Sequence, residues 1–228
     1  MIENKKRFYG GIVSLIGFLV VLIIFFLPLY EGKNGLDYLD NLFNSISKGS
    51  AYYIPKVKST VDNYKGSQIS AEIPIESEEE GKNVALLYES GGAEAIIQGG
   101  ALKISGDLGG ILSRCLEDAD HMYSNEGEEL SRKYGYNERA ALYNWWRSLN
   151  NLDKALKKQK KFKEAEVISI VVKKAVEPSY NYYRIEPQNI GDRWGFVIFA
   201  LVFYVVYTLW YGYSIMYMFE GWGMKLGH

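Results

Sequence analysis

Two long stretches without a charged residue constrain this chain more than any other feature. The first is Phe8–Tyr30 and the second is Trp194–Phe219. As α-helices they would be about 34 and 39 Å long, enough to cross a hydrocarbon core of about 30 Å. A buried helix in a soluble protein is usually much shorter. The sequence therefore predicts transmembrane helices over residues 8–30 and 194–219.

The residues that flank the first stretch predict whether it is cleaved and how it is oriented in the membrane. The basic residues Lys5–Arg7 precede it as in a signal peptide, but the apolar stretch is too long for one. No small-residue cleavage motif follows, so we expect an uncleaved signal anchor. Excess positive charge in residues 1–7 favours a cytoplasmic N-terminus, and two spans return residues 220–228 to the cytoplasm. Residues 31–193 are then extracytoplasmic, on a cell (inner or plasma) membrane.

The charge balance and the scarcity of cysteine and histidine exclude several functions. The chain has 26 Lys+Arg and 27 Asp+Glu, so no basic face for nucleic acid is expected. The single cysteine, Cys115, excludes an internal disulfide and Cys-ligated clusters. Neither span contains a histidine or a charge, which disfavours haem ligation or an ion path. Without a nucleophile motif such as GxSxG, we expect no catalytic residue, metal or cofactor, and no enzyme.

The region between the spans is predicted to be a helical bundle. No proline occurs between residues 75 and 177, which suits long helices. Apolar residues in Asn34–Ile46 follow helical spacing. Asn137 is a plausible N-cap for a helix whose apolar stripe includes Trp145. The stripe continues beyond Phe162 with a shift in phase.

Two further segments complete the predicted domain, one as a helix and one as an extended link. Glu76–Leu116 is expected to be helical, with several glycines. Ile69–Ile75 alternates like a strand, but Pro74 and the lack of an evident partner strand favour an extended link. The overall prediction is a mainly α fold, in which two transmembrane helices bracket an extracytoplasmic helical-bundle domain.

Glycine recurs with a period of seven in the predicted helix. Ala85, Gly92, Gly99, Gly106 and Ser113 would form a narrow stripe of small residues that lets another backbone approach closely. Each glycine costs about 1 kcal/mol of helix propensity, so tight packing would have to offset that cost. The favoured interpretation is packing within the domain or against a partner. The alternative is that the glycine pairs break the segment into short helices.

Aromatic residues mark candidate partner contacts in both regions. Trp145 and Trp146 are about 100° apart on a helix, so one is expected to be buried and the other available to a partner or the membrane interface. The second span is rich in tyrosine and tryptophan, whose polar groups need acceptors inside a membrane. The candidate partner-binding residues there are Tyr204, Tyr207, Trp210, Tyr211 and Tyr217.

Three explanations for the aromatic span remain open. Packing on another protein's helices is favoured, with help from the small-residue pairs Gly10-xxx-Ser14 and Thr208-xxx-Gly212. A lipid or a quinone-like ring near the second span is an alternative. A self-associating membrane scaffold, with the glycine stripe or the same small-residue pairs making the contact, is the third.

Two polar clusters in the outer region carry weaker signals. His121 with Glu117 and Asp118 resembles half of a di-metal site, but there is no second internal histidine, so a solvated helix end is favoured. Lysines are frequent between Lys154 and Lys163. A solvated helix end is again the simpler interpretation, and docking to an acidic partner or anionic headgroups is the alternative.

The sequence favours a non-catalytic membrane subunit. Such a subunit anchors and scaffolds a larger membrane complex, and respiratory and electron-transfer complexes are assemblies of this kind. It would bind other integral-membrane subunits through the second span, and an extracytoplasmic subunit through the outer domain. The runner-up is an extracytoplasmic sensor, which would need a separate signalling partner because residues 220–228 are too short for an output module.

Overall fold

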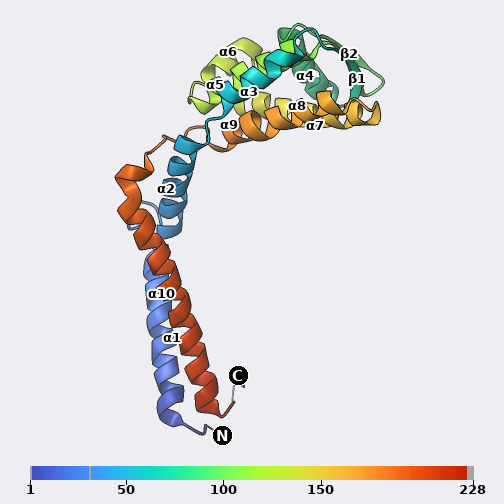
Figure 1. Ribbon diagram of the computed structural model, residues 1–228. Coiled ribbons are helices and arrows are strands. Elements are labelled where there is room, and N and C mark those ends of the chain that lie inside the picture. The colour runs from blue at the N-terminus through green and yellow to red at the C-terminus, as the bar shows by residue number, and fades with distance from the viewer. Residues whose placement is uncertain (1, 31, 225–228) are drawn as a thin grey trace. The chain divides into compact units, whose positions relative to one another are not determined.

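The computed structural model describes residues 2–30 and 32–224, and over these it is mainly helical with one small sheet (Figure 1). Residues 225–228 of the expected C-terminal tail lie outside the described residues. The chain divides into two compact units. The first unit contains Met1–Ile46 and Pro187–His228, and the second contains Ser47–Glu186.

The first unit is dominated by α1 (Lys5–Phe26) and α10 (Ile190–Trp222), which pack along each other (Figure 1). Their apolar windows have mean hydropathies of 2.6 and 1.8, and only 6% of each window is buried. A core helix of a soluble protein would be mostly buried, so these helices do not serve as one. Both are long and apolar enough to cross a membrane.

Local sequence sets the ends of the two long helices. Asn4 caps α1 by accepting a hydrogen bond from the Arg7 backbone N–H at 3.1 Å. The helix ends at Phe26 because Leu27, which precedes Pro28, is extended. Asn189 caps α10 in the same way, and Gly223 ends it with a φ of 92°, a conformation that favours glycine. The second expected span lies within α10, whereas α1 ends four residues before the expected end of the first span at Tyr30.

Helix α2 (Gly35–Ser50) begins in the first unit, and its last residues belong to the second. This confirms the helix expected over Asn34–Ile46. The other elements of the second unit are listed in chain order: α3 (Ile54–Val61), η1 (Asp62–Tyr64), β1 (Gln68–Pro74), α4 (Glu78–Ser90), β2 (Glu94–Gln98), β3 (Ala101–Asp107), α5 (Leu108–Tyr123), α6 (Glu128–Tyr134), α7 (Glu138–Lys158), α8 (Phe162–Val171), η2 (Val172–Val176) and α9 (Glu177–Asn181).

A three-stranded antiparallel sheet replaces part of the expected bundle. Its strand order is β1-β3-β2, so β1 is an edge strand. The extended link expected at Ile69–Ile75 is wrong, because this segment pairs with β3 as β1. Pro74 is its last residue, opposite Ala101, where an edge strand tolerates a proline. The alternation of this segment was correct evidence for a strand, and its partner was hidden in the segment predicted as helix.

The continuous helix expected over Glu76–Leu116 is also wrong. Gly99 and Gly100 have φ values of 60° and 81° and form the two-residue turn between β2 and β3. Gly92, with a φ of 81°, lies in the turn before β2. Gly106 belongs to β3, and a Cβ added there would lie 2.8 Å from the Ala93 Cα. Gly92, Gly99 and Gly106 therefore form no helical stripe. Of these three, Gly106 does pack closely against another backbone of the domain, at Ala93.

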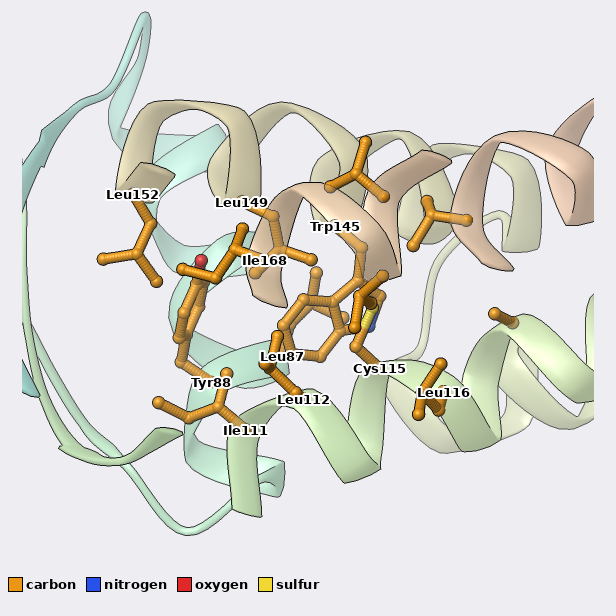
Figure 2. Packing of buried hydrophobic residues seen from close by; sticks show 14 of the residues in the cluster. Leu87, Tyr88, Ile111, Leu112, Cys115, Leu116, Trp145, Leu149, Leu152 and Ile168 are labelled. Carbon is orange, nitrogen blue, oxygen red and sulfur yellow. The ribbon is translucent and has the colours of Figure 1, made fainter. Parts of the chain in front are cut away.

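The core of the second unit gathers around Trp145 of α7. Its ring lies 5.2 Å from that of Tyr88 in α4, and both side chains are fully buried. Figure 2 shows Leu112 and Cys115 of α5 beside Trp145, with Leu149 one turn further along α7. Burial raises the pKa of the Cys115 thiol, which suits a packing role.

Helix α7 confirms the most detailed expectation from the sequence. Asn137 caps it by accepting a hydrogen bond from the Ala140 backbone N–H at 3.1 Å. The predicted apolar stripe is fully buried, at Leu142, Trp145, Leu149, Leu152 and Leu156. The expected change of phase corresponds to the break between α7 and α8, where Lys160 has a φ of 64°.

Candidate functional site

The contact between α1 and α10 brings together several polar groups of these two helices. The Ser14 and Ser214 hydroxyls lie 2.8 Å apart, and Trp210 donates its Nε1–H to the Ser14 Oγ at 2.9 Å. Tyr207 donates its hydroxyl to the Phe18 carbonyl at 3.2 Å. These groups therefore have partners within the chain, as a polar group in an apolar surrounding requires.

Small residues let the two helices approach. A Cβ on Gly11 would lie 2.8 Å from the Met218 Cγ and from the Ser214 carbonyl oxygen. Gly10 has nothing within 4 Å of such an atom. Of the expected pair Gly10-xxx-Ser14, the serine lies in the contact and the glycine does not.

The aromatic residues predicted as one partner-binding face are divided by the fold. Tyr207 and Trp210 face α1, where their polar groups donate hydrogen bonds to Phe18 and Ser14. Tyr204 is 69% exposed and Tyr211 is 49% exposed, although the Tyr211 ring also contacts Phe18. Tyr217 is exposed on another side of α10.

A stripe along one side of α10 remains open. It consists of Tyr204, Thr208, Tyr211 and Gly212, which helical spacing places on neighbouring turns, and we call it the hydroxyl stripe. The Thr208 hydroxyl donates to the Tyr204 carbonyl at 2.7 Å. Among the described residues, no acceptor lies within hydrogen-bond reach of the Tyr204 or Tyr211 hydroxyl. A Cβ on Gly212 would meet nothing within 4 Å, so this side of α10 is free for close approach.

The first unit also contains an apolar cavity of about 670 Å³. It lies where the end of α1, the start of α2 and the start of α10 meet. Its lining residues are Phe25, Leu29, Tyr30, Gly35, Tyr38, Leu39, Gly195, Phe196, Phe199, Ala200 and Phe203. Stacked rings continue from it along α10, since the Phe203 centroid is 6.0 Å from that of Phe199 and 5.3 Å from that of Tyr207. The chemistry of this cavity suits a hydrocarbon chain or a flat ring.

In the second unit, the two adjacent tryptophans behave as expected. Trp145 is buried, and Trp146 is half-buried, with its indole at the surface of α7. Trp145 donates its Nε1–H to Asp118 at 2.8 Å, and Trp146 donates to Glu177 at 3.0 Å.

Asp118 is the centre of a buried polar network that sequence reasoning missed. Its carboxylate is 1% exposed and accepts hydrogen bonds from Trp145, from Tyr134 and from Lys133, the last at 2.7 Å. Burial and the adjacent Asp118 charge raise the pKa of Tyr134 far above its usual value, so its hydroxyl remains a donor. The network ties α5, α6 and α7 together. The only sequence signal was an acidic residue inside the apolar stripe of α5.

The cluster around His121 is not brought together as a metal site. The His121 Nδ1 lies 3.1 Å from Glu126, and the Asp118 oxygens are occupied by three donors. Across residues 2–30 and 32–224, no three His, Cys, Asp or Glu side chains are placed to hold a metal ion.

A buried lysine was also missed. Lys48 is 2% exposed, and its Nζ donates to the Asn125 Oδ1 at 2.9 Å and to the Ile185 carbonyl at 2.7 Å. Burial lowers the pKa of its ammonium group. These bonds fasten the first and last segments of the second unit to each other.

Comparison of the chain with protein-family models, with curated proteins and with solved structures finds no match.

Proposed function

We propose that this chain is a non-catalytic, two-pass integral-membrane subunit that anchors and scaffolds a larger membrane complex. The observation that carries the proposal is the hydroxyl stripe on α10. Two exposed tyrosine hydroxyls and an open glycine lie on a helix that is long and apolar enough to span a bilayer.

Membrane physics supports a protein partner on this stripe. A hydroxyl in hydrocarbon lacks the water that would satisfy it, and an unsatisfied polar group there costs several kcal/mol. A partner helix would supply acceptors to Tyr204 and Tyr211. Gly212 would allow the two backbones to approach, as small residues do in membrane helix pairs.

The proposed topology places both termini in the cytoplasm and the second unit outside, for the charge reasons given above. We expect a membrane-impermeant maleimide to label Ser59→Cys in intact cells, because Ser59 is exposed on α3. Glu3→Cys should be labelled only after the cells are permeabilised. Cys115 is fully buried and should stay unlabelled in both conditions. The reverse pattern for the two variants would overturn the orientation.

The partner role is tested by removing the two free hydroxyls. The double variant Tyr204→Phe, Tyr211→Phe should lower the yield of co-purified membrane partner by about tenfold, since an interhelical hydrogen bond contributes about 0.6–2 kcal/mol. Gly212→Leu should have a similar effect by blocking close approach. The measurement is a pull-down in mild detergent, with mass spectrometry of the partners and a count of their stoichiometry.

Val206→Leu is the matched control, because it changes bulk on a different exposed side of α10. It should leave the partner yield unchanged. Tyr207→Phe is unsuitable as a test of partner binding, because Tyr207 already bonds Phe18 within the chain. Full partner yield with the double variant would count against the proposal, and a complex of identical copies would instead support a self-associating scaffold.

A second candidate function is an extracytoplasmic sensor that signals through a separate partner. It is favoured by a cavity of about 300 Å³ between α7 and α9 in the second unit, lined mainly by aromatic side chains. Ligand binding there would not conflict with a subunit role.

A further inference from the structure

The cavity between α7 and α9 has an unusual lining. Tyr143 and Trp146 come from α7, while Glu177, Tyr180 and Asn181 come from α9. Three of the five side chains are therefore aromatic and one is a carboxylate. At about 300 Å³ the cavity has the size of a small-molecule site.

The rings of Tyr143 and Trp146, which we call the aromatic wall, are held in place by contacts within the chain. The Tyr143 and Trp146 rings stack with centroids 5.6 Å apart and an interplanar angle of 26°. Trp146 donates its Nε1–H to the Glu177 Oε1 at 3.0 Å, which fixes the indole and the carboxylate together. Within the described residues no donor bonds the second oxygen of Glu177, so this oxygen is available to a ligand.

A π-helical turn places Glu177 on this wall. Residues Val172–Val176 form η2, and the Glu177 backbone N–H bonds the Val172 carbonyl five residues earlier. The extra residue in this turn changes the phase of α9 relative to α8. Such π-turns are rare and are frequent at functional sites.

We propose that this cavity binds a small quaternary ammonium cation, of the trimethylammonium type. Aromatic faces attract such a cation through their quadrupoles, and a nearby carboxylate adds direct charge attraction. A hydrated ammonium or sodium ion loses more water on entry, so the aromatic wall selects for the alkylated cation. This inference is independent of the proposed subunit role.

Arg139 is a basic side chain near the cavity that does not line it. The Arg139 guanidinium lies 5.9 Å from the Tyr180 ring centroid and 5.4 Å from that of Tyr183. The guanidinium is therefore just within cation–π range of the Tyr180 ring. Arg139→Gln should therefore leave binding of a quaternary ammonium ion intact or strengthen it, whereas binding of an anion would be lost.

The test is calorimetric titration of the full-length chain, purified in a maltoside detergent, with tetramethylammonium and with choline. Both cations should bind. The neutral carbon isostere of choline, 3,3-dimethylbutan-1-ol, should bind at least about tenfold more weakly, because it has the same shape without the charge. Equal affinity for choline and its isostere would overturn the proposal, as would binding of a neutral sugar in place of the cation.

Variants locate the binding to this cavity. Glu177→Gln keeps an oxygen for Trp146 but removes the charge, and Tyr143→Leu removes a ring that is 45% exposed, so neither should disturb the core. Each should weaken binding by about three- to thirtyfold. Phe162→Leu is the control, because Phe162 is an exposed aromatic residue of the second unit outside the cavity. Unchanged affinity in both cavity variants would overturn the assignment.

The same headgroup chemistry can come from a free metabolite or from a lipid. Competition by phosphatidylcholine vesicles, but not by phosphatidylglycerol vesicles, would identify the lipid headgroup as the source. Displacement by free choline alone would identify a soluble ligand.

Discussion

Replacing Asp118 by alanine is expected to lower the free energy of unfolding of the second unit by about 3–5 kcal/mol. The substitution leaves the buried Trp145 N–H and the Tyr134 hydroxyl without an acceptor, and it leaves the Lys133 ammonium without its counter-charge. Trp145 and Tyr134 are buried, so water cannot replace the lost acceptor there, whereas the Lys133 side chain is 31% exposed and stays partly hydrated. Urea unfolding of the full-length chain in detergent, followed by tryptophan fluorescence, measures the change.

The neighbouring carboxylate Glu117 supplies the matched control. Its ion pair with Arg114 is largely exposed, so Glu117→Ala should change the free energy of unfolding by less than about 1 kcal/mol. The free energy of unfolding of Asp118→Asn should lie between those of Asp118→Ala and Glu117→Ala. The single amide oxygen can accept hydrogen bonds from only some of the donors that surround the carboxylate. An Asp118→Ala variant as stable as Glu117→Ala would show that the network does not stabilise the fold.

Replacing Gly11 by valine is expected to separate α1 from α10. The added side chain would collide with backbone atoms of α10 at Ser214 and Met218, which cannot move as a flexible side chain can. The readout is a cross-link between cysteines placed at Ser14 and Ser214, whose hydroxyls lie 2.8 Å apart. The yield of this cross-link in isolated membranes should fall by roughly tenfold, because overpacking of this kind costs about 1–3 kcal/mol.

Gly10→Val is the control for this experiment. It adds the same side chain one residue earlier, where a Cβ would have no other atom within 4 Å. The cross-link yield should therefore be unchanged. A full cross-link yield in both glycine variants would contradict the packing of α1 on α10. Loss of the cross-link in both would point to a general effect of valine on helix α1.

The partner proposal depends on this packing. Helix α1 packs on one side of α10 and accepts hydrogen bonds from Tyr207 and Trp210. Tyr204 and Tyr211 lie on a side of α10 that stays exposed. The sequence alone treated all of these residues as one aromatic face. Packing separates those that stabilise the helix pair from those available to a partner.

Local chemistry was enough to predict the long helices. An uninterrupted apolar stretch predicts a span whatever surrounds it. The prediction extends the first span to Tyr30, although Pro28 is a local stop signal and α1 ends at Phe26. Helix α7 was predictable for the same reason, since Asn137 caps it and its apolar residues recur on one face.

The sheet could not be found in this way. A strand needs a partner, and the partner of β1 is separated from it by α4 and β2. Without that partner the sequence predicts only an extended link at Ile69–Ile75, and it places the glycines of the β2–β3 turn within a helix. The positive φ values at Gly99 and Gly100 are a requirement of the hairpin, and hairpins are specified by pairing between strands.

By itself, then, the sequence determined the two apolar helices, the amphipathic α7 and the scarcity of metal-binding side chains, because each depends on residues close together in the chain or on composition. Tertiary structure decided which tyrosines of α10 are used internally, how Asp118 is satisfied, and that Trp146, Glu177 and Tyr180 line one cavity. Those arrangements depend on which faces of distant helices meet. Burial and pairing between distant segments set them, and neither is encoded in local spacing.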